Sequence, residues 1–150
     1  MSEKLYLSWE DIHQLTSKIH NETLSLDNGN LAIIGISRGG LVPAVLMSHM
    51  KNPSLFCTVG IKSYEGEERK QDQIYQLPPK ELLQNKDVIY LIDDICDTGK
   101  TLLNLRENML HLNVISISLV YKKNELHKPD YYGFEHSDDK WVVFPWESHK

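Results

Sequence analysis

The chain has 150 residues, a formal net charge of −5 at pH 7, and 41% hydrophobic and 25% charged residues. This length predicts one domain with a core large enough to form without disulfides. The acidic balance argues against nucleic acid as the main partner, because proteins that bind it usually carry a basic face. Cys57 and Cys96 lack metal-ligand spacing, and the sequence shows neither a signal peptide nor an apolar run of membrane-spanning length, so we expect a cytoplasmic protein.

The first predicted element is an amphipathic helix. Ser8 is a suitable N-cap, and Glu10 and Asp11 place acidic residues in the first turn. Apolar residues then recur three and four positions apart, which predicts one face that packs against a sheet. That face consists of Trp9, Ile12, Leu15 and Ile19.

A strand, a glycine loop and a helix follow. Residues 31–36 are a continuous apolar run, which predicts a strand buried on both faces, and residues 41–50 predict a helix. The loop between them, Ser37-Arg38-Gly39-Gly40, is of a kind that binds phosphate, and the guanidinium of Arg38 can bind phosphate oxygens bidentately. The alternative left open is that the glycines only make a tight turn.

The middle of the chain predicts a strand, a polar loop and two short elements. Residues 55–61 predict the strand, and Ser63-Tyr64 opens a loop of about residues 63–73 that ends in nine residues without an apolar side chain. This loop is either a solvated hairpin or a lid that closes over a reacting centre. Residues 74–77 predict a short edge strand, and residues 80–84 predict one turn of helix.

Residues 88–101 carry the clearest chemical signal. Residues 88–92 predict another strand buried on both faces, and three carboxylates follow where it is expected to end: Asp93, Asp94 and Asp97. Residues 98–101, Thr-Gly-Lys-Thr, lead into a predicted helix at 102–110. Ligands of open α/β sheets bind at the carboxyl ends of strands, and a helix start offers N–H groups to phosphate. A nucleotide-binding P-loop is excluded, because its first glycine would fall on Asp94.

The last part of the chain predicts a fifth strand and a small hood. Residues 114–121 are rich in Val and Ile and predict the strand, which ends at Lys122-Lys123. The aromatic-rich pieces 131–134 and 141–147 lie close together in the chain. They predict a small antiparallel hood beside the main sheet, within about residues 124–150.

Four motifs in the same order resemble those of type I phosphoribosyltransferases. Val88–Thr101 resembles their signature for phosphoribosyl pyrophosphate (PRPP), which is an apolar strand, two acids and Asp-Thr-Gly-x-Thr. Ser37–Gly40 resembles the pyrophosphate loop of the bacterial xanthine-guanine branch, and Ser63-Tyr64 matches the start of the catalytic flexible loop. Gly133–Glu135 and Asp139–Val143 resemble the hypoxanthine-guanine branch. The resemblance implies an α/β fold with a mostly parallel central sheet of about five strands, flanking helices and a small C-terminal hood.

The resemblance implies purine salvage, in which hypoxanthine, guanine or xanthine is joined to PRPP to give the nucleoside monophosphate and pyrophosphate. Asp97 would take or share the proton on purine N7, as an acid/base. Lys122 would meet the 6-oxygen, with Lys123 as the competing assignment. Trp141 would stack on the base, unless it is a core aromatic, and the backbone of Val142 would read the edge of the base.

The resemblance also implies how PRPP is held. Asp93 and Asp94 would accept the ribose hydroxyls, directly or through Mg²⁺, which suits carboxylates because they only accept hydrogen bonds. Glu147 stands near the position of an acid that ligates a second Mg²⁺ in relatives. The phosphate on the ribose is assigned to Asp97, Thr98, Gly99, Lys100 and Thr101. The pyrophosphate is assigned to Ser37, Arg38, Gly39 and, in place of a late arginine of relatives, Arg69.

The expected partners are PRPP and a 6-oxopurine, without nucleic acid or membrane. Because relatives form dimers or tetramers, a homo-oligomer is expected by resemblance alone. The alternative function is a regulator that keeps this fold but binds nucleotide or RNA without transferring anything. The acidic net charge and the presence of Asp97 and Lys122, neither of which sensing requires, argue against the regulator.

Overall fold

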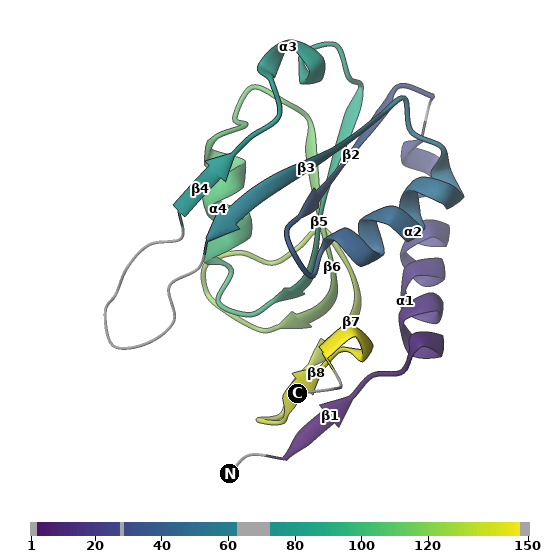
Figure 1. Cartoon of the computed structure of the whole chain (residues 1–150), viewed down its shortest axis with the longest axis vertical. Coiled ribbons are helices and arrows are strands. Elements are labelled where there is room, and N and C mark those ends of the chain that lie inside the picture. The colour runs from purple at the N-terminus through teal and green to yellow at the C-terminus, as the bar shows by residue number, and fades with distance from the viewer. Residues whose placement is uncertain (1–2, 28, 63–72, 148–150) are drawn as a thin grey trace.

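A six-stranded sheet of order β4-β3-β2-β5-β6-β7 forms the centre of the computed structural model, which describes residues 3–27, 29–62 and 73–147 (Figure 1). The strands are β2 (Leu31–Ile36), β3 (Leu55–Lys62), β4 (Gln73–Gln76), β5 (Val88–Cys96), β6 (Val114–Lys122) and β7 (Tyr131–His136). In the sheet order β3-β2-β5-β6-β7, each strand runs parallel to its neighbours. The edge strand β4 runs antiparallel to β3. The predicted mostly parallel sheet is confirmed, with six strands rather than five.

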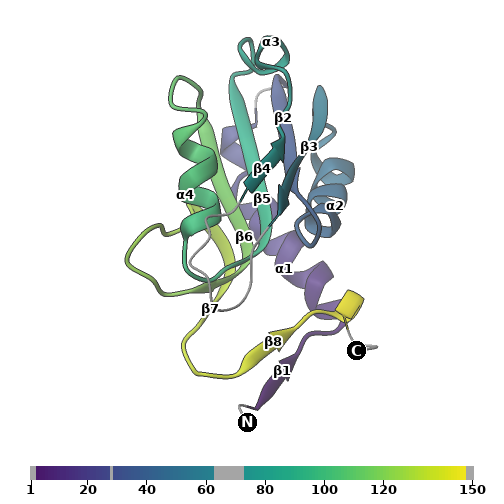
Figure 2. The same cartoon turned by 60° about the vertical axis from the view of Figure 1, so that its left-hand side comes forward.

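Helices cover both faces of this sheet (Figure 2). They are α1 (Trp9–Glu22), α2 (Leu41–Lys51), α3 (Lys80–Leu83) and α4 (Lys100–Glu107), with 3₁₀ turns η1 (Leu24–Leu26) and η2 (Pro145–Glu147). Successive strand residues point to opposite faces. In β2, Ile33 therefore joins the apolar cluster under α1 and α2, whereas Ile34 joins the cluster under α3 and α4. This two-sided burial is what the continuous apolar runs predicted.

The start of α1 shows one correct and one wrong prediction. Ser8 caps the helix as predicted: its hydroxyl accepts from Asp11 N at 3.0 Å, and its own N–H donates to the Asp11 carboxylate at 2.8 Å. Trp9, expected on the buried face, is 57% exposed. The first turn of α1 extends past the end of the sheet, so Trp9 instead meets the ring of Trp146 in η2, 5.9 Å away between centroids.

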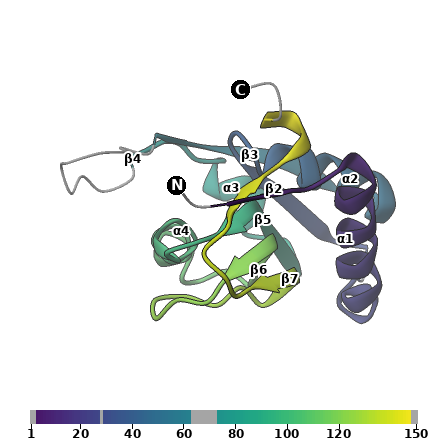
Figure 3. The ribbon, with the colours of Figure 1, turned by 90° about the horizontal axis from the view of Figure 1, so that it is seen from below.

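The predicted hood exists, but its construction differs from the prediction. β7 belongs to the main sheet and runs parallel to β6. The strand β8 (Trp141–Val143) pairs instead with β1 (Lys4–Tyr6), and the two are parallel. We use "hood" for β1, β8 and η2, which lie across the carboxyl ends of the parallel strands (Figure 3). An antiparallel hood from residues 124–150 alone is therefore wrong, because the partner strand comes from the other end of the chain.

None of the helices in the described ranges is both long enough and apolar enough to cross a bilayer. The loop predicted at about 63–73 lies outside the described residues except for Gln73, which begins β4. The single domain stays a prediction.

Two partly buried histidines are expected to make stability depend on pH. Burial lowers the pKa of His20, with the nearby charge of Lys51 adding to the effect; burial also lowers the pKa of His127, with Arg106 adding. Unfolded histidine binds its proton near about pH 6.5. Below that pH the unfolded state therefore binds more protons than the folded state. The stability that is present above about pH 6.5 is lost as the pH falls through the pKa values of the folded state.

Thermal unfolding at several pH values between about 7 and 5 measures this loss. The wild-type Tm should fall with pH, and the combined variant His20→Gln and His127→Gln should show a shallower fall. Equal slopes for the two proteins would contradict the prediction.

Candidate active site

Three aspartates lie at the carboxyl end of β5, in the middle of the sheet. β5 continues beyond Ile92 to Cys96, so the prediction that the strand ends before the acids is wrong, because the ladder to β6 extends to the pair Cys96 and Tyr121. Asp94 N donates to the Asp93 carboxylate at 2.9 Å, and the N–H of the next residue, Ile95, donates to the Asp94 carboxylate at 2.8 Å. Burial raises the pKa of Asp94, and the charge of Glu147 raises it further.

The turn after β5 forms a polar pocket at the start of α4. The pocket has a volume of about 80 Å³, and its polar lining comes from Asp93, Asp97, Thr98, Gly99 and Thr101. Gly99 has φ +84° and is the N-cap of α4, so the N-cap residue itself has no side chain to accept from the helix, and the hydroxyl of Thr98 accepts from Lys100 N at 3.3 Å. The N–H groups at a helix start and the positive end of the helix dipole suit an anion, and the phosphate site predicted here stays a prediction.

The glycine loop between β2 and α2 lies directly against the acids. A Cβ on Gly39 would lie 1.8 Å from Oδ2 of Asp94, and a Cβ on Gly40 would lie 2.5 Å from the carbonyl oxygen of Ile92. Glycine is therefore required at both positions for the loop to approach β5. The sequence left two alternatives for this loop, a tight turn and a loop that binds an anion. The two are compatible here, because the tight turn brings the exposed Arg38 to the acidic site.

The hydroxyl of Ser37 acts on the neighbouring strand. It accepts from Ile61 N at 3.3 Å, and Ser37 N donates to the carbonyl of Val59 at 2.9 Å. These bonds join the ends of β2 and β3. They fix the base of the loop that presents Arg38.

A second pocket, of about 110 Å³, lies between the acids and the hood. Its lining comes from β5 and the following turn, the end of β6 and the hood: Asp94, Ile95, Asp97, Lys122, Trp141, Val142, Phe144 and Glu147. The ammonium of Lys122 lies 3.6 Å from the carboxylate of Asp97. Lys123 is exposed and is not part of this lining, so the geometry favours Lys122 over its neighbour as the residue that faces a ligand.

Trp141 and Val142 in β8 both line this pocket. Trp141 is 62% exposed, so the alternative that it is a core aromatic is wrong. In the ladder to β1, Trp141 N donates to the carbonyl of Glu3, and Leu7 N donates to the carbonyl of Val143, both at 2.9 Å. Backbone groups alternate along a strand, so those of Val142 point away from β1. Sequence reasoning missed β1, which carries no local signal of its distant partner.

The acids in the described ranges suit a metal ion that a substrate also ligates, rather than a metal ion that protein side chains alone ligate. Within the described ranges, no three His, Cys, Asp or Glu side chains are grouped to hold a metal ion. Mg²⁺ often binds through one or two carboxylates and substrate phosphates, which needs no such group. Glu147 accepts from Phe144 N at 3.0 Å and lines the second pocket with Asp94. Ser63, Tyr64 and Arg69 lie outside the described residues, so their predicted roles stay predictions.

Comparison with known proteins points to one family. The model of the phosphoribosyl transferase domain matches residues 4–149. A xanthine-guanine phosphoribosyltransferase of Cereibacter sphaeroides is 32% identical over 145 residues, which are 95% of this chain and 86% of the relative. The crystal structure of a purine phosphoribosyltransferase from Pyrococcus horikoshii has a TM-score of 0.82 and 31% identity, over 97% of this chain and 94% of that one. A Helicobacter pylori xanthine-guanine-hypoxanthine phosphoribosyltransferase shares the fold at 18% identity and a TM-score of 0.82, over 98% and 96% of the two chains.

Proposed function

Because this chain belongs to the phosphoribosyltransferase family and is an enzyme of purine salvage, we propose that it joins a 6-oxopurine to PRPP and releases pyrophosphate. The observation that carries this proposal is the pairing of Asp97 and Lys122, 3.6 Å apart, in the pocket that Trp141 borders. Curated relatives named xanthine-guanine phosphoribosyltransferase support the same class of base.

The Asp97–Lys122 pair matches one edge of a 6-oxopurine. O6 and N7 lie side by side on that edge. The ammonium of Lys122 has only donors, so it suits the 6-oxygen, and the carboxylate of Asp97 has only acceptors, so it suits a proton on N7. A 6-amino group would set donor against donor at Lys122, and a mismatch of this kind can discriminate by about 10⁴ to 10⁵. The exposed ring of Trp141 offers a stacking surface to the base.

PRPP would bind along the turn after β5 and the glycine loop. The start of α4, with Thr98 and Thr101, receives the phosphate on the ribose, and Asp93 and Asp94 accept the ribose hydroxyls. The pyrophosphate lies towards Arg38 and Gly39, beside Asp94. Mg²⁺, which Asp93, Asp94 and Glu147 would hold, would neutralise charge on the leaving pyrophosphate.

In the transfer, N9 of the base bonds to the anomeric carbon of the ribose as the bond from that carbon to pyrophosphate breaks. The ribose becomes positively charged, and the carboxylates of Asp93 and Asp94 beside it stabilise that charge. The proton on N7 passes to Asp97, which leaves a neutral purine in the product. The homo-oligomer remains a proposal that rests on resemblance to the family, and the cytoplasmic location remains a proposal that rests on the sequence alone.

Initial rates with PRPP, Mg²⁺ and each of four bases test the proposal. Hypoxanthine, guanine or xanthine should give nucleotide, and adenine should give little. Lys122→Gln should raise the KM for the base, whereas the matched variant Lys123→Gln should leave it unchanged, because Lys123 lies outside the pocket lining. Absence of product with every 6-oxopurine would contradict the proposal and favour the nucleotide-binding regulator.

A further inference from the structure

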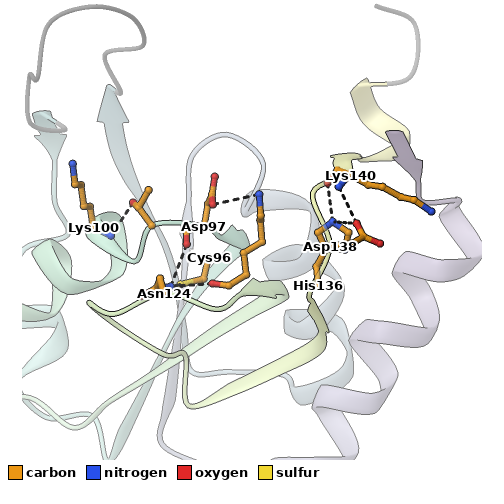
Figure 4. Close-up of polar contacts among 9 residues, drawn as sticks. Cys96, Asp97, Lys100, Asn124, His136, Asp138 and Lys140 are labelled. Carbon is orange, nitrogen blue, oxygen red and sulfur yellow. Dashed lines mark hydrogen bonds and ion pairs between the residues drawn. The ribbon is translucent and has the colours of Figure 1, made fainter. Parts of the chain in front are cut away.

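One amide side chain joins the two segments that carry Asp97 and Lys122. The Nδ2 group of Asn124 donates to the carbonyl oxygen of Asp97 at 3.2 Å (Figure 4) and to that of Lys122 at 3.1 Å. Asp97 lies in the turn after β5, and Lys122 ends β6. Asn124 therefore links the backbones of two residues whose side chains face the base.

The other half of the amide fixes its orientation. Oδ1 of Asn124 accepts from Leu126 N at 3.0 Å and from His127 N at 2.8 Å. With both N–H groups held on Oδ1, the Nδ2 side must point to the two carbonyls. The amide of Asn124 therefore donates through Nδ2 and accepts through Oδ1 at the same time. An aspartate carboxylate has the same shape but can only accept.

Asn124 also supports the phosphate-binding turn from behind. A Cβ on Gly99 would lie 2.6 Å from Oδ1 of Asn124 and 2.9 Å from His127 N. Gly99 therefore rests directly on the turn that Asn124 closes. Nearby, burial raises the pKa of Cys96 to about 11, so this thiol stays neutral and accepts only a weak contact from Nδ2 at 3.7 Å.

We propose that Asn124 is a positioning residue for the transfer reaction, which holds Asp97 and Lys122 at the separation that the base requires. It lines neither pocket, so it acts through these two residues and not on the substrate. This inference rests on the proposed function of the Asp97–Lys122 pair. A displacement of about 1 Å in such a pair can lower a rate by about 10²-fold.

The main variant is Asn124→Ser, because serine can still close the turn through its hydroxyl but is too short to reach both carbonyls. We expect kcat/KM for the base to fall by about 10- to 10²-fold, with little change in Tm. Asn124→Asp keeps the acceptor and removes both donors, and should show the same loss. The matched control is Asn113→Ser: Asn113 donates to the carbonyl of Asp87 at 2.8 Å, at the opposite end of the sheet, so its kinetics should stay unchanged.

A double-mutant cycle separates positioning from a merely structural role. If Asn124 acts through Lys122, then Asn124→Ser should reduce kcat/KM far less in a Lys122→Gln background than in the wild type. Additive losses, or unchanged kinetics in both Asn124 variants, would overturn the inference. If the wild-type chain transfers no base at all, the proposed function itself fails, which is a different result.

Discussion

Replacement of Asp97 by asparagine is expected to lower kcat by about 10² to 10⁴, with little change in the affinity for PRPP. The amide keeps the shape of the carboxylate but cannot take the N7 proton. PRPP binding should survive, because the groups that we assign to the ribose phosphate are backbone N–H groups of residues 97–101, which the variant keeps, and the hydroxyls of Thr98 and Thr101. The loss should therefore be confined to the chemical step.

Turnover at saturating substrates and the Kd of PRPP from titration calorimetry measure the two effects separately. Asp87→Asn is a matched control, because Asp87 is an exposed acid immediately before β5, at the other end of the same strand. That variant should match the wild type in both measurements. Unchanged turnover in Asp97→Asn would remove the acid/base role.

The long buried strands were predictable because their signal is local. The apolar run at 31–36 gave β2 with both ends correct, since a turn sequence precedes it and a glycine loop follows. β5 was predicted to end too early. Asp93 and Asp94 have low strand propensity, yet Asp93, Ile95 and Cys96 all pair with β6 and keep this stretch in the strand. Tertiary pairing outweighed local preference there.

The hood shows what a local pattern cannot reveal. The piece 141–147 was predicted to be part of an antiparallel hood, but its strand Trp141–Val143 pairs in parallel with Lys4–Tyr6 from the opposite end of the chain. The parallel pairing of β7 to β6 was missed for a similar reason, because neighbouring aromatic pieces suggested an antiparallel pair.

The residues that line the candidate site were easier to predict than the residue that holds two of them in place. The resemblance to the family implied that Asp97 and Lys122 face the same base, and both lie at the edge of the sheet where the parallel strands β5 and β6 end. Asn124 gave no such signal, because an asparagine in a polar connection resembles any turn residue. Its hydrogen-bond partners, two carbonyl groups and two N–H groups, are brought around its side chain by the fold.

A buried ion pair holds the amino-terminal end of the sheet, far from the candidate site. The ammonium of Lys51, whose side chain is 0% exposed, lies 2.5 Å from the carboxylate of Asp27. The hydroxyl of Tyr90 in β5 donates to the other oxygen of Asp27 at 2.5 Å, and Lys51 lies over the Tyr90 ring, 5.4 Å from its centroid. These three side chains join the last turn of α2, the residue after η1 and the central strand β5.

Lys51→Met is expected to lower the free energy of unfolding by about 3 kcal/mol or more, because it leaves Asp27 partly buried without its counter-charge. Denaturant unfolding measures this loss. Lys18→Met is the matched control: it breaks an exposed hydrogen bond to the carbonyl of Tyr132 and a pair with Glu22 whose side chains are 49% and 45% exposed, so it should cost only about 1 kcal/mol. Adding Asp27→Leu to Lys51→Met should recover part of the loss, since no unpaired charge then remains. Equal losses for Lys51→Met and Lys18→Met would show that burial adds nothing to the Lys51–Asp27 pair.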